Sequence, residues 1–449
     1  MLSAVQRYFA PAPHQPRLPD DEVARLYPRL RWSILESTFL GYGTFYLLRN
    51  NLSPVTKELE GALGYTHNDV GSIVAITAIT YGVGKLLMGS LSDRSNVRRF
   101  MPFGLLMTAA CNFAFGSVAS LHVHMALWAL NGLFQGMGWA PCGRSVGHWF
   151  SVRERGLVFG TWNVSHNIGG GVAGVMAAEA AQYFGGWQYA FFVPGVLSVF
   201  MAIYLALRLR DTPQSCGLPP IEEYRNDFPG GEHVPTHERE LGTRELFVDY
   251  ILTNKYLWLF ALTNFFVYIT RYAMLDWGPV YLREVKGATL SGGGLAVLIL
   301  EFGGIPSTIF LGWVSDRLGG RRGMVALLCM VPVVLAFAGI LLNPPGHSWI
   351  DLALLATVGF FVYPALNLIA ISGLDLTSKK AVGTAAGFIG MFGYLGRTVE
   401  AKGVGWAADH YTALYGQAVA WQIVFSAIIG CGLMSIVLLA FAWNVKPRA

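Results

Sequence analysis

Residues 32–52 read WSILESTFLGYGTFYLLRNNL, an apolar run that is long enough to cross a lipid bilayer. Arg49 lies within this run, where a charged side chain costs about 3 kcal/mol even on the lowest scales. A second apolar run, residues 256–282, contains Arg271, 222 positions after Arg49. A charge in such a run normally faces a cavity and has a functional partner. The two stretches therefore predict a membrane protein with a polar site among its helices.

The chain repeats itself at nearly the same offset. The motif GSLSDR at residues 89–94 returns as GWVSDR at residues 312–317, which is 223 positions later. WNVSHNIGGGVAGVMA, residues 162–177, likewise aligns with FIGMFGYLGRTVEAKGVGWA, residues 388–407. We infer that the chain is a duplication and that each half brings one of the two arginines to an equivalent depth.

Composition excludes a soluble globular protein. Of 449 residues, 53% are hydrophobic and 13% are charged, and the mean hydropathy is +0.45. Runs of spanning length are expected at about 32–56, 70–92, 99–119, 122–146, 157–182, 187–208, 254–282, 290–314, 323–342, 350–373, 382–408 and 415–443. We therefore predict an all-α polytopic membrane protein whose 12 transmembrane helices form two six-helix bundles related by pseudo-twofold symmetry.

The longest polar interruption divides the chain. The expected parts are a cytoplasmic N-terminal segment (1–31), an N-terminal bundle (32–208), a cytoplasmic linker (209–253), a C-terminal bundle (254–443) and a cytoplasmic tail (444–449). Lys and Arg gather in the loops on one side of the predicted helices, while the other side has Lys57, Arg283 and Lys286. Because cytoplasmic loops retain positive charge, both termini are expected in the cytoplasm. The net charge of +5 is explained in this way and gives no reason to expect a nucleic-acid partner.

No metal site, cofactor or enzymatic activity is expected. The five cysteines have no short paired spacing, and the first thirty residues lack the apolar core of a signal peptide. His233 and His237 beside Glu238 have a spacing that metal ligands use, but they lie in a polar stretch rich in Pro and Gly. Solvated charge is the favoured interpretation of that stretch.

The partner expected for Arg49 and Arg271 is an oxyanion, because a guanidinium offers a planar fork of donors that suits phosphate and carboxylate. On a helix, Thr38, Tyr42, Phe45, Tyr46 and Arg49 form one stripe, and Asn264, Tyr268 and Arg271 form another. Neither stripe carries a carboxylate. The alternative role of the two arginines is structural pairing with Glu36 or Asp276.

Further polar residues lie within the apolar runs. Lys85 is a candidate for the site, or it extends towards the cytoplasmic edge; His166 is a candidate, or it is a packing residue. Arg397 and Glu400 are three residues apart, so that they either neutralise each other or contact the substrate. The other candidate ligands are Tyr81, Asn163, Glu301, Tyr363 and Tyr394. The two SDR motifs place Asp93, Arg94, Asp316 and Arg317 at helix ends, where Asp and Arg are expected to form charged latches to neighbouring helices. The alternative is that the arginines only anchor the loops on the cytoplasmic side.

The chain resembles the organophosphate:phosphate antiporters of the major facilitator superfamily, and among them the glycerol-3-phosphate carriers. FLGYGTFYLLRNN (39–51), NGLFQGMGWAPCGRSVGHWF (131–150), RDTPQSCGLPPIEEYRNDFP (210–229) and FVYITRYAMLDWGPVYLREVK (266–286) carry the resemblance. It implies phosphate-binding arginines at Arg49 and Arg271, a lysine at Lys85, a histidine at His166, a glutamate at Glu301 and cavity tyrosines at Tyr42, Tyr46, Tyr81, Tyr363 and Tyr394. Asn50, and the charged Arg397, Glu400 and Lys402, depart from the glycerol-3-phosphate pattern.

The resemblance implies a monomeric antiporter of the bacterial inner membrane that exchanges a small organophosphate for inorganic phosphate by alternating access. Glycerol-3-phosphate is the favoured organic substrate. Phosphoglycerate and hexose phosphates are alternatives because of the departures. A membrane sensor, which binds an organophosphate and signals without moving it, is the rival from another functional class.

Overall fold

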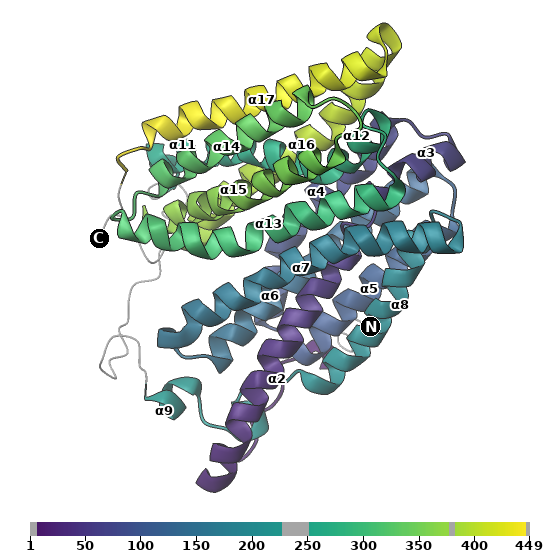
Figure 1. Ribbon diagram of the computed structural model, residues 1–449. Helices are drawn as coiled ribbons and strands as arrows, with labels where there is room; N and C mark the ends of the chain where they lie inside the picture. The colour runs from purple at the N-terminus through teal and green to yellow at the C-terminus, as the bar shows by residue number, and fades with distance from the viewer. Residues whose placement is uncertain (1–6, 227–250, 377–381, 446–449) are drawn as a thin grey trace. The chain divides into compact units, whose positions relative to one another are not determined.

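The computed structural model describes residues 7–226, 251–376 and 382–445, apart from some side chains within helices, and these residues fold almost entirely into helices. In the described part of the chain, twelve helices have 18 residues or more. They are α2 (Asp20–Leu47), α4 (His67–Asp93), α5 (Val97–Ser117), α6 (Leu121–Trp149), α7 (Val152–Phe184), α8 (Tyr189–Arg208), α11 (Lys255–Tyr272), α13 (Leu290–Arg317), α14 (Arg322–Leu342), α15 (Ser348–Asp375), α16 (Val382–Tyr415) and α17 (Gln417–Phe441) (Figure 1). The all-α prediction is confirmed.

Seven of these helices contain a stretch that is long and apolar enough to cross a membrane by length and composition alone. They are α4, α5, α8, α13, α14, α15 and α17. The other long helices of the described chain are α2, α6, α7, α11 and α16. All of them except α6 carry, or directly precede, residues of the candidate site, and polar side chains lower the hydropathy of a helix that lines a polar path.

Contacts between residues divide the chain into two compact units. Unit 1 consists of Met1–Asn50, Thr80–Ala173 and Gln188–His237, and unit 2 consists of Asn51–Ile79, Gly174–Trp187 and Glu238–Ala449. Most of the predicted N-terminal bundle belongs to unit 1. The first turns of α4 and the last turns of α7 belong to unit 2, where they contact helices from the second half of the sequence.

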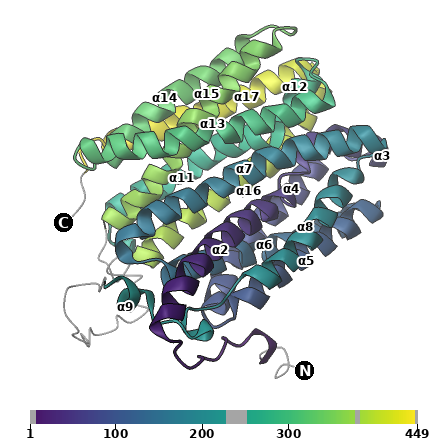
Figure 2. The same ribbon diagram turned by 60° about the horizontal axis from the view of Figure 1, so that its bottom comes forward.

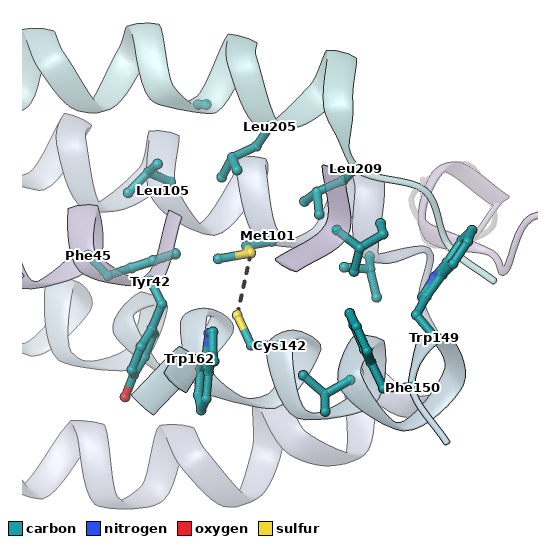
Figure 3. Close-up of a cluster of buried hydrophobic side chains, with 14 of the residues drawn as sticks. Tyr42, Phe45, Met101, Leu105, Cys142, Trp149, Phe150, Trp162, Leu205 and Leu209 are labelled. Carbon is teal, nitrogen blue, oxygen red and sulfur yellow. Dashed lines mark hydrogen bonds between the residues drawn. The ribbon is translucent and has the colours of Figure 1, made fainter. Parts of the chain in front are cut away.

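Aromatic and aliphatic side chains form the core of unit 1, where α5 packs against α6 and α8, and α2 packs against α6 and α8. Figure 3 shows Phe45 among these side chains and the ring of Tyr42 beside that of Trp162. The Cys142 thiol lies 3.9 Å from the Met101 sulfur. The core fixes the face of α2 from which Tyr42 projects.

Close helix packing builds unit 2, where α15 contacts α13 and α14, and α11 contacts α16 and α17. Both ribbon views show α13, α14, α15 and α17 side by side (Figure 2). A Cβ atom on Gly359 would overlap the carbonyl oxygen of Leu300, so that only glycine permits this approach of α15 to α13. Gly359 thus acts as a packing residue in unit 2.

The helix boundaries near the two arginines differ from the predicted ones. A run at 32–56 was expected, but α2 begins at Asp20 and ends at Leu47. The chain then turns and continues through the short helices η1 (Ser53–Val55) and α3 (Thr56–Leu63), the first of which has Pro54 near its start. Proline has no N–H to donate, which the first turn of a helix tolerates, so Pro54 suits the start of η1.

The seventh run is also interrupted. Helix α11 ends at Tyr272, a π-helical segment η4 covers Ala273–Trp277, and α12 covers Gly278–Glu284 with Pro279 in its first turn. A π-turn adds a residue to the helical repeat and rotates the side chains that follow it, and such turns often occur at functional sites. Arg49 and Arg271 therefore lie at corresponding irregularities, one just after α2 and the other just before η4.

Ion pairs hold the predicted cytoplasmic end of unit 1. Asp211 accepts hydrogen bonds from Arg144 (2.8 Å) and from the backbone N–H of Val97 (3.3 Å). Glu154 accepts from Arg31 and from Arg225, the latter at 3.2 Å. Burial alone would raise the pKa of Glu154, but hydrogen bonds from Arg31 and the backbone N–H of Ser151 hold it below its ordinary value. His233, His237 and Glu238 lie outside the described residues, as does the side chain of Asp93.

Candidate functional site

Arg49 lies in the turn that follows α2 and is 7% exposed. Its guanidinium lies 4.2 Å from the ring centroid of Tyr81 and 5.2 Å from that of Tyr46. The turn is fixed by hydrogen bonds to the Tyr46 carbonyl from the backbone N–H groups of Arg49 (3.1 Å) and Asn50 (3.0 Å). A cation on aromatic faces keeps its charge while it is removed from water.

Lys85 belongs to the same group of side chains in unit 1. Its Nζ atom lies 5.5 Å from the ring centroid of Tyr81 and 5.3 Å from that of Trp139. Tyr81 therefore contacts both Arg49 and Lys85, which places two positive charges on one aromatic ring. Two like charges close together favour a shared anion. The structure places Lys85 beside Tyr81 and Trp139, and its role in ligand binding stays a prediction.

His166 reaches the group through Tyr46, with 5.6 Å between the two ring centroids. Its Nδ1 atom donates a hydrogen bond to the carbonyl oxygen of Asn163, one turn earlier on α7. This bond places the proton on Nδ1 and orients the ring. Tyr42 completes the group, at 5.4 Å from Tyr46, and stacks on Trp162 at 4.8 Å. The predicted residues of the first half thus form one continuous cluster, which we call the Arg49 cluster.

Arg271 is the centre of a second cluster, in unit 2, and is 8% exposed. Its Nη2 atom donates to the Tyr363 hydroxyl at 3.2 Å, and Nη1 donates to the Tyr272 hydroxyl at 3.4 Å. The guanidinium also lies over both rings, 4.5 Å from the centroid of Tyr363 and 4.8 Å from that of Tyr272. Its Nε atom has no hydrogen-bond partner among the described residues.

A carboxylate approaches Arg271 from α13. Glu301 Oε1 lies 3.9 Å from Arg271 Nη2, and the Glu301 side chain is fully buried. Tyr268 and Tyr394 extend the same cluster through ring contacts: Tyr268 lies 5.5 Å from Tyr272 and 5.7 Å from Tyr394. We call this group the Arg271 cluster. It gathers the predicted residues of the second half, and Arg397 adjoins it through the ring of Tyr272.

Arg397 has a different partner from the one that its spacing suggests. Its Nε and Nη2 atoms donate to Asp276 on η4, at 3.0 to 3.2 Å, and its guanidinium lies 4.0 Å from the ring centroid of Tyr272. Glu400 does not pair with it. Asp276 thus bonds to Arg397, and Glu36 bonds to Tyr204 (2.6 Å) and Arg208 (2.9 Å). The structure thus gives each of these two acids an arginine partner other than Arg49 and Arg271, namely Arg208 for Glu36 and Arg397 for Asp276.

The SDR motif of the second half forms a latch. Asp316 pairs with Arg322, the first residue of α14, and this pair ties α13 to the next helix. Arg317 lies 4.2 Å from the ring centroid of Trp313 rather than on Asp316. In the first half, Arg94 is exposed.

Three aromatic residues at the clusters escaped the sequence reasoning, and Trp139, which lies beside Lys85, is one of them. Tyr272 bonds to Arg271 and lies beneath Arg397, and Trp162 packs on Tyr42. The position of Tyr272 directly after Arg271 was an available signal, but neighbours in sequence do not share a face of a regular helix. The π-helical turn that begins at Ala273 has no signature in the sequence that we recognised.

Comparisons with known proteins agree with a membrane-transport fold. The profile of the Major Facilitator Superfamily matches residues 38–399. The chain is 40% identical over 448 residues to the glycerol-3-phosphate transporter of Bacillus subtilis (strain 168), with 98% of each protein covered. It is 36% identical over 432 residues to the membrane sensor protein UhpC of Salmonella typhimurium, with 95% of each covered.

One solved structure illustrates the fold. A bacterial homolog to the human lysosomal transporter Spinster, in an inward-facing and unoccupied conformation, aligns with a TM-score of 0.71 and 14% sequence identity. The alignment covers 92% of this chain and 95% of that chain. At this identity the likeness concerns the fold alone.

Proposed function

Since the chain belongs to the major facilitator superfamily, a family of transporters rather than enzymes, we propose that it exchanges a small organophosphate for inorganic phosphate across a bacterial inner membrane, acting as a monomer with both termini in the cytoplasm. Glycerol-3-phosphate is the favoured organic substrate. The observation that carries this proposal is the pair of buried guanidinium groups, Arg49 and Arg271, each held among tyrosine rings at a helix irregularity of its own half.

The phosphoryl group is the part of the substrate that these clusters suit. A dianionic phosphate needs cationic, hydrogen-bond-donating partners that are already removed from water, since such bonds are about twice as strong as neutral ones. The Arg49 cluster offers a guanidinium, the Lys85 ammonium and His166. The Arg271 cluster offers a guanidinium whose Nε atom is unpartnered among the described residues. Both clusters also offer tyrosine hydroxyls.

The exchange mechanism follows from charge. In the proposed cycle, Arg49 and Arg271 bind one phosphoryl group from the two halves, and Lys85 and His166 add charge and hydrogen bonds. Without an anion the cationic groups repel one another, and this repulsion makes closure of the empty carrier unfavourable. A bound phosphate removes this repulsion in both directions of the cycle. Phosphate that leaves the cell then drives the organophosphate in, since a ligand shifts a conformational equilibrium by its differential affinity for the two states.

Glu301 reduces the net positive charge of the Arg271 cluster. At 3.9 Å it partly balances the guanidinium charge while no phosphate is bound. An incoming phosphate competes with this carboxylate for the same donors. We propose that the competition keeps phosphate binding weak enough for release on the far side of the membrane.

Charge-conserving substitutions test the proposal. Purified Arg49→Lys and Arg271→Lys variants in proteoliposomes are expected to lose phosphate exchange about a hundredfold, because lysine keeps the charge but cannot offer a bidentate fork. Arg208→Lys is the matched control, since Arg208 is bonded to the surface carboxylate of Glu36 at 2.9 Å. Unchanged phosphate exchange in both the Arg49→Lys and the Arg271→Lys variant would refute the proposal that these two arginines bind the phosphoryl group.

The organic part of the substrate needs a direct measurement. Arg397 is engaged by Asp276, which removes one reason to expect a second anionic group on the substrate. This pairing favours glycerol-3-phosphate over phosphoglycerate. A competition panel of glycerol-3-phosphate, 3-phosphoglycerate and hexose 6-phosphate against labelled phosphate uptake decides the order.

A sensor is the second candidate function, because a relative of 36% identity is named as a membrane sensor protein. A sensor binds its ligand but moves little of it. Counterflow of labelled phosphate distinguishes the two functions. Proteoliposomes that are preloaded with unlabelled phosphate accumulate external label if the protein is a transporter, whereas a sensor shows saturable binding without accumulation.

A further inference from the structure

Glu400, on α16, is buried without a hydrogen-bond partner. The residue is 2% exposed, and neither carboxyl oxygen has a hydrogen-bond partner among the described residues. Within residues 7–226, 251–376 and 382–445, it is the one carboxyl group whose two oxygens are both buried and both unpartnered. Its role is not explained by phosphate binding, since Arg397 on the same helix is bonded to Asp276.

The surroundings of Glu400 contain one cation for two acids. Asp276 on η4 and Arg397 on α16 are the charged groups that interact with Glu400 electrostatically. Tyr272 of α11 lies beneath the Arg397 guanidinium at 4.0 Å, and Lys402 points instead to α4, where Nζ donates to Ser72 Oγ at 2.6 Å. With both acids ionised, this buried group would carry a net negative charge. One proton on Glu400 makes it neutral.

An ionised carboxylate in this position has no donor to replace the water that it loses. Burial of an unpaired ion is so unfavourable that the group normally neutralises instead. Asp276 takes the bidentate interaction with Arg397, and ionised Glu400 would have to compete for the same guanidinium. The geometry therefore requires that Glu400 is a neutral carboxylic acid in this conformation.

Directly beside Glu400 in the sequence, α16 makes a tight contact with α4. A Cβ atom on Gly71 would overlap the carbonyl oxygen of Ala401, the residue after Glu400. One on Gly405 would overlap the carbonyl oxygen of His67. We call this the α4–α16 contact. It lies near the start of α4, on the side of Lys57, which the charge rule predicts to be extracytoplasmic.

We propose that Glu400 is a proton-binding site that takes up one proton when the α4–α16 contact closes and releases it when the contact opens. The proposal rests on the proposed function, because a carrier that takes up substrate by alternating access must open on its outer side. Opening the contact hydrates the carboxyl group, and the proton leaves to external water. Closing it returns the proton from the same side, so that the cycle carries no net proton.

The consequence is sensitivity to external pH. Because closure takes up a proton, external acid favours the closed contact, by up to about tenfold per pH unit for a single group. External alkali leaves Glu400 ionised in the open state and opposes closure. The internal pH has no such effect, because Glu400 is buried while the contact is closed.

Infrared spectroscopy of the purified full-length protein in nanodiscs tests the protonation itself. A protonated carboxyl group has a C=O stretching band that a carboxylate lacks. We expect this band in the wild type at neutral pH and its loss in Glu400→Gln. Glu179→Gln, which alters an exposed acid on α7, is the control and keeps the band. Identical spectra of the wild type and Glu400→Gln in this region would overturn the proposal.

Transport tests the link to the contact. Labelled phosphate exchange is measured in proteoliposomes at fixed internal pH and varied external pH. The ratio of Glu400→Gln to wild-type rates is expected to approach one in external acid and to rise with external pH, because glutamine mimics the protonated acid. The ratio for Glu179→Gln stays constant. A pH-independent ratio for Glu400→Gln overturns the proposal. Absence of exchange in every protein refutes the proposed function instead, and the infrared band then still decides the state of Glu400.

Discussion

Tyr363 holds Arg271 in two ways, through its hydroxyl at 3.2 Å from Nη2 and through its ring at 4.5 Å from the guanidinium. Tyr363→Phe keeps the ring and removes the hydroxyl. Loss of one hydrogen bond to a charged group costs about 1.5 kcal/mol, so we expect phosphate affinity to fall about tenfold. Binding of labelled phosphate to the purified protein measures the change.

The ring is examined with a second variant. Tyr363→Leu removes both interactions and is expected to weaken binding further than Tyr363→Phe. Equal affinities in the wild type and Tyr363→Phe would show that the hydroxyl does not position Arg271.

The sequence predicted which charged residues lie in the candidate site better than it predicted the residues to which they bond. Arg49 and Arg271 are recognisable because a guanidinium in an apolar run has few structural explanations. Arg397 was assigned to Glu400 or to the substrate because regular helical spacing places residues three apart on one face. In the structure, Asp276 of the π-helical segment η4 bonds to Arg397 of α16, and both carboxyl oxygens of Glu400 are left without a hydrogen-bond partner.

Among the elements, α4 begins at a charged junction within unit 2. The two ring nitrogens of His67 face two carboxylates, with Nδ1 2.9 Å from Glu60 of α3 and Nε2 3.2 Å from Glu284 of α12. Asp409 of α16 accepts the backbone N–H groups of His67 (3.2 Å) and Asn68 (2.7 Å). The junction therefore fastens three helices to the start of α4.

Removal of the His67 ring leaves two carboxylates that are largely buried, with side chains 10% and 6% exposed. Breaking a buried pair on one side costs about 3 kcal/mol. We expect His67→Ala to lower the free energy of unfolding by about this amount, as measured by thermal unfolding in detergent. His410→Ala on α16 is the control, because its ring stacks on the exposed Trp406. Equal midpoints for the two variants would contradict the role of the junction.

The free energy of unfolding at low pH provides a second test of the same junction. Burial alone would raise the pKa of Glu284, but the hydrogen bond and charge of His67 hold it below its ordinary value. A lowered pKa adds stability above the unfolded pKa, and this stability is lost as the pH falls through the folded pKa. The wild type is therefore expected to lose more stability in acid than His67→Ala does.

Helix existence was predictable from hydropathy, whereas helix ends were not. All twelve predicted runs correspond to long helices in the described chain. The first was placed at 32–56, yet α2 extends from Asp20 to Leu47. Its polar first turns are stabilised by acidic residues at the helix start rather than by the bilayer. Its end is set by the turn that carries Arg49.

For the whole molecule, the duplication seen in the sequence explains why Arg49 and Arg271 lie at corresponding positions, at the ends of α2 and α11. It did not predict that residues 51–79 and 174–187 belong to the same compact unit as the second half. Those contacts depend on glycines that allow backbones to meet, such as Gly174 of α7, where a Cβ atom would lie 2.6 Å from Val297 of α13. Hydrophobic patterns of single helices contain no information about such pairings, because many small residues compete for the same role.

Gly71 allows a test of whether the α4–α16 contact governs transport as a whole. Gly71→Ala forces a methyl group against the carbonyl oxygen of Ala401, which belongs to the backbone and cannot turn aside. The helices must separate, so we expect Gly71→Ala to favour the open contact and to slow phosphate exchange. When Ser72→Cys is also present, a maleimide is expected to label the cysteine at position 72 faster with Gly71→Ala than without it. Gly61→Ala is the matched control, since a Cβ atom there meets nothing within 4 Å. Because separation also hydrates Glu400, the variant should weaken the infrared band of the protonated acid. Faster labelling with an unchanged infrared band would show that opening of the α4–α16 contact is not coupled to the protonation of Glu400. An unchanged labelling rate would mean that the contact tolerates the methyl group and does not set the conformational equilibrium.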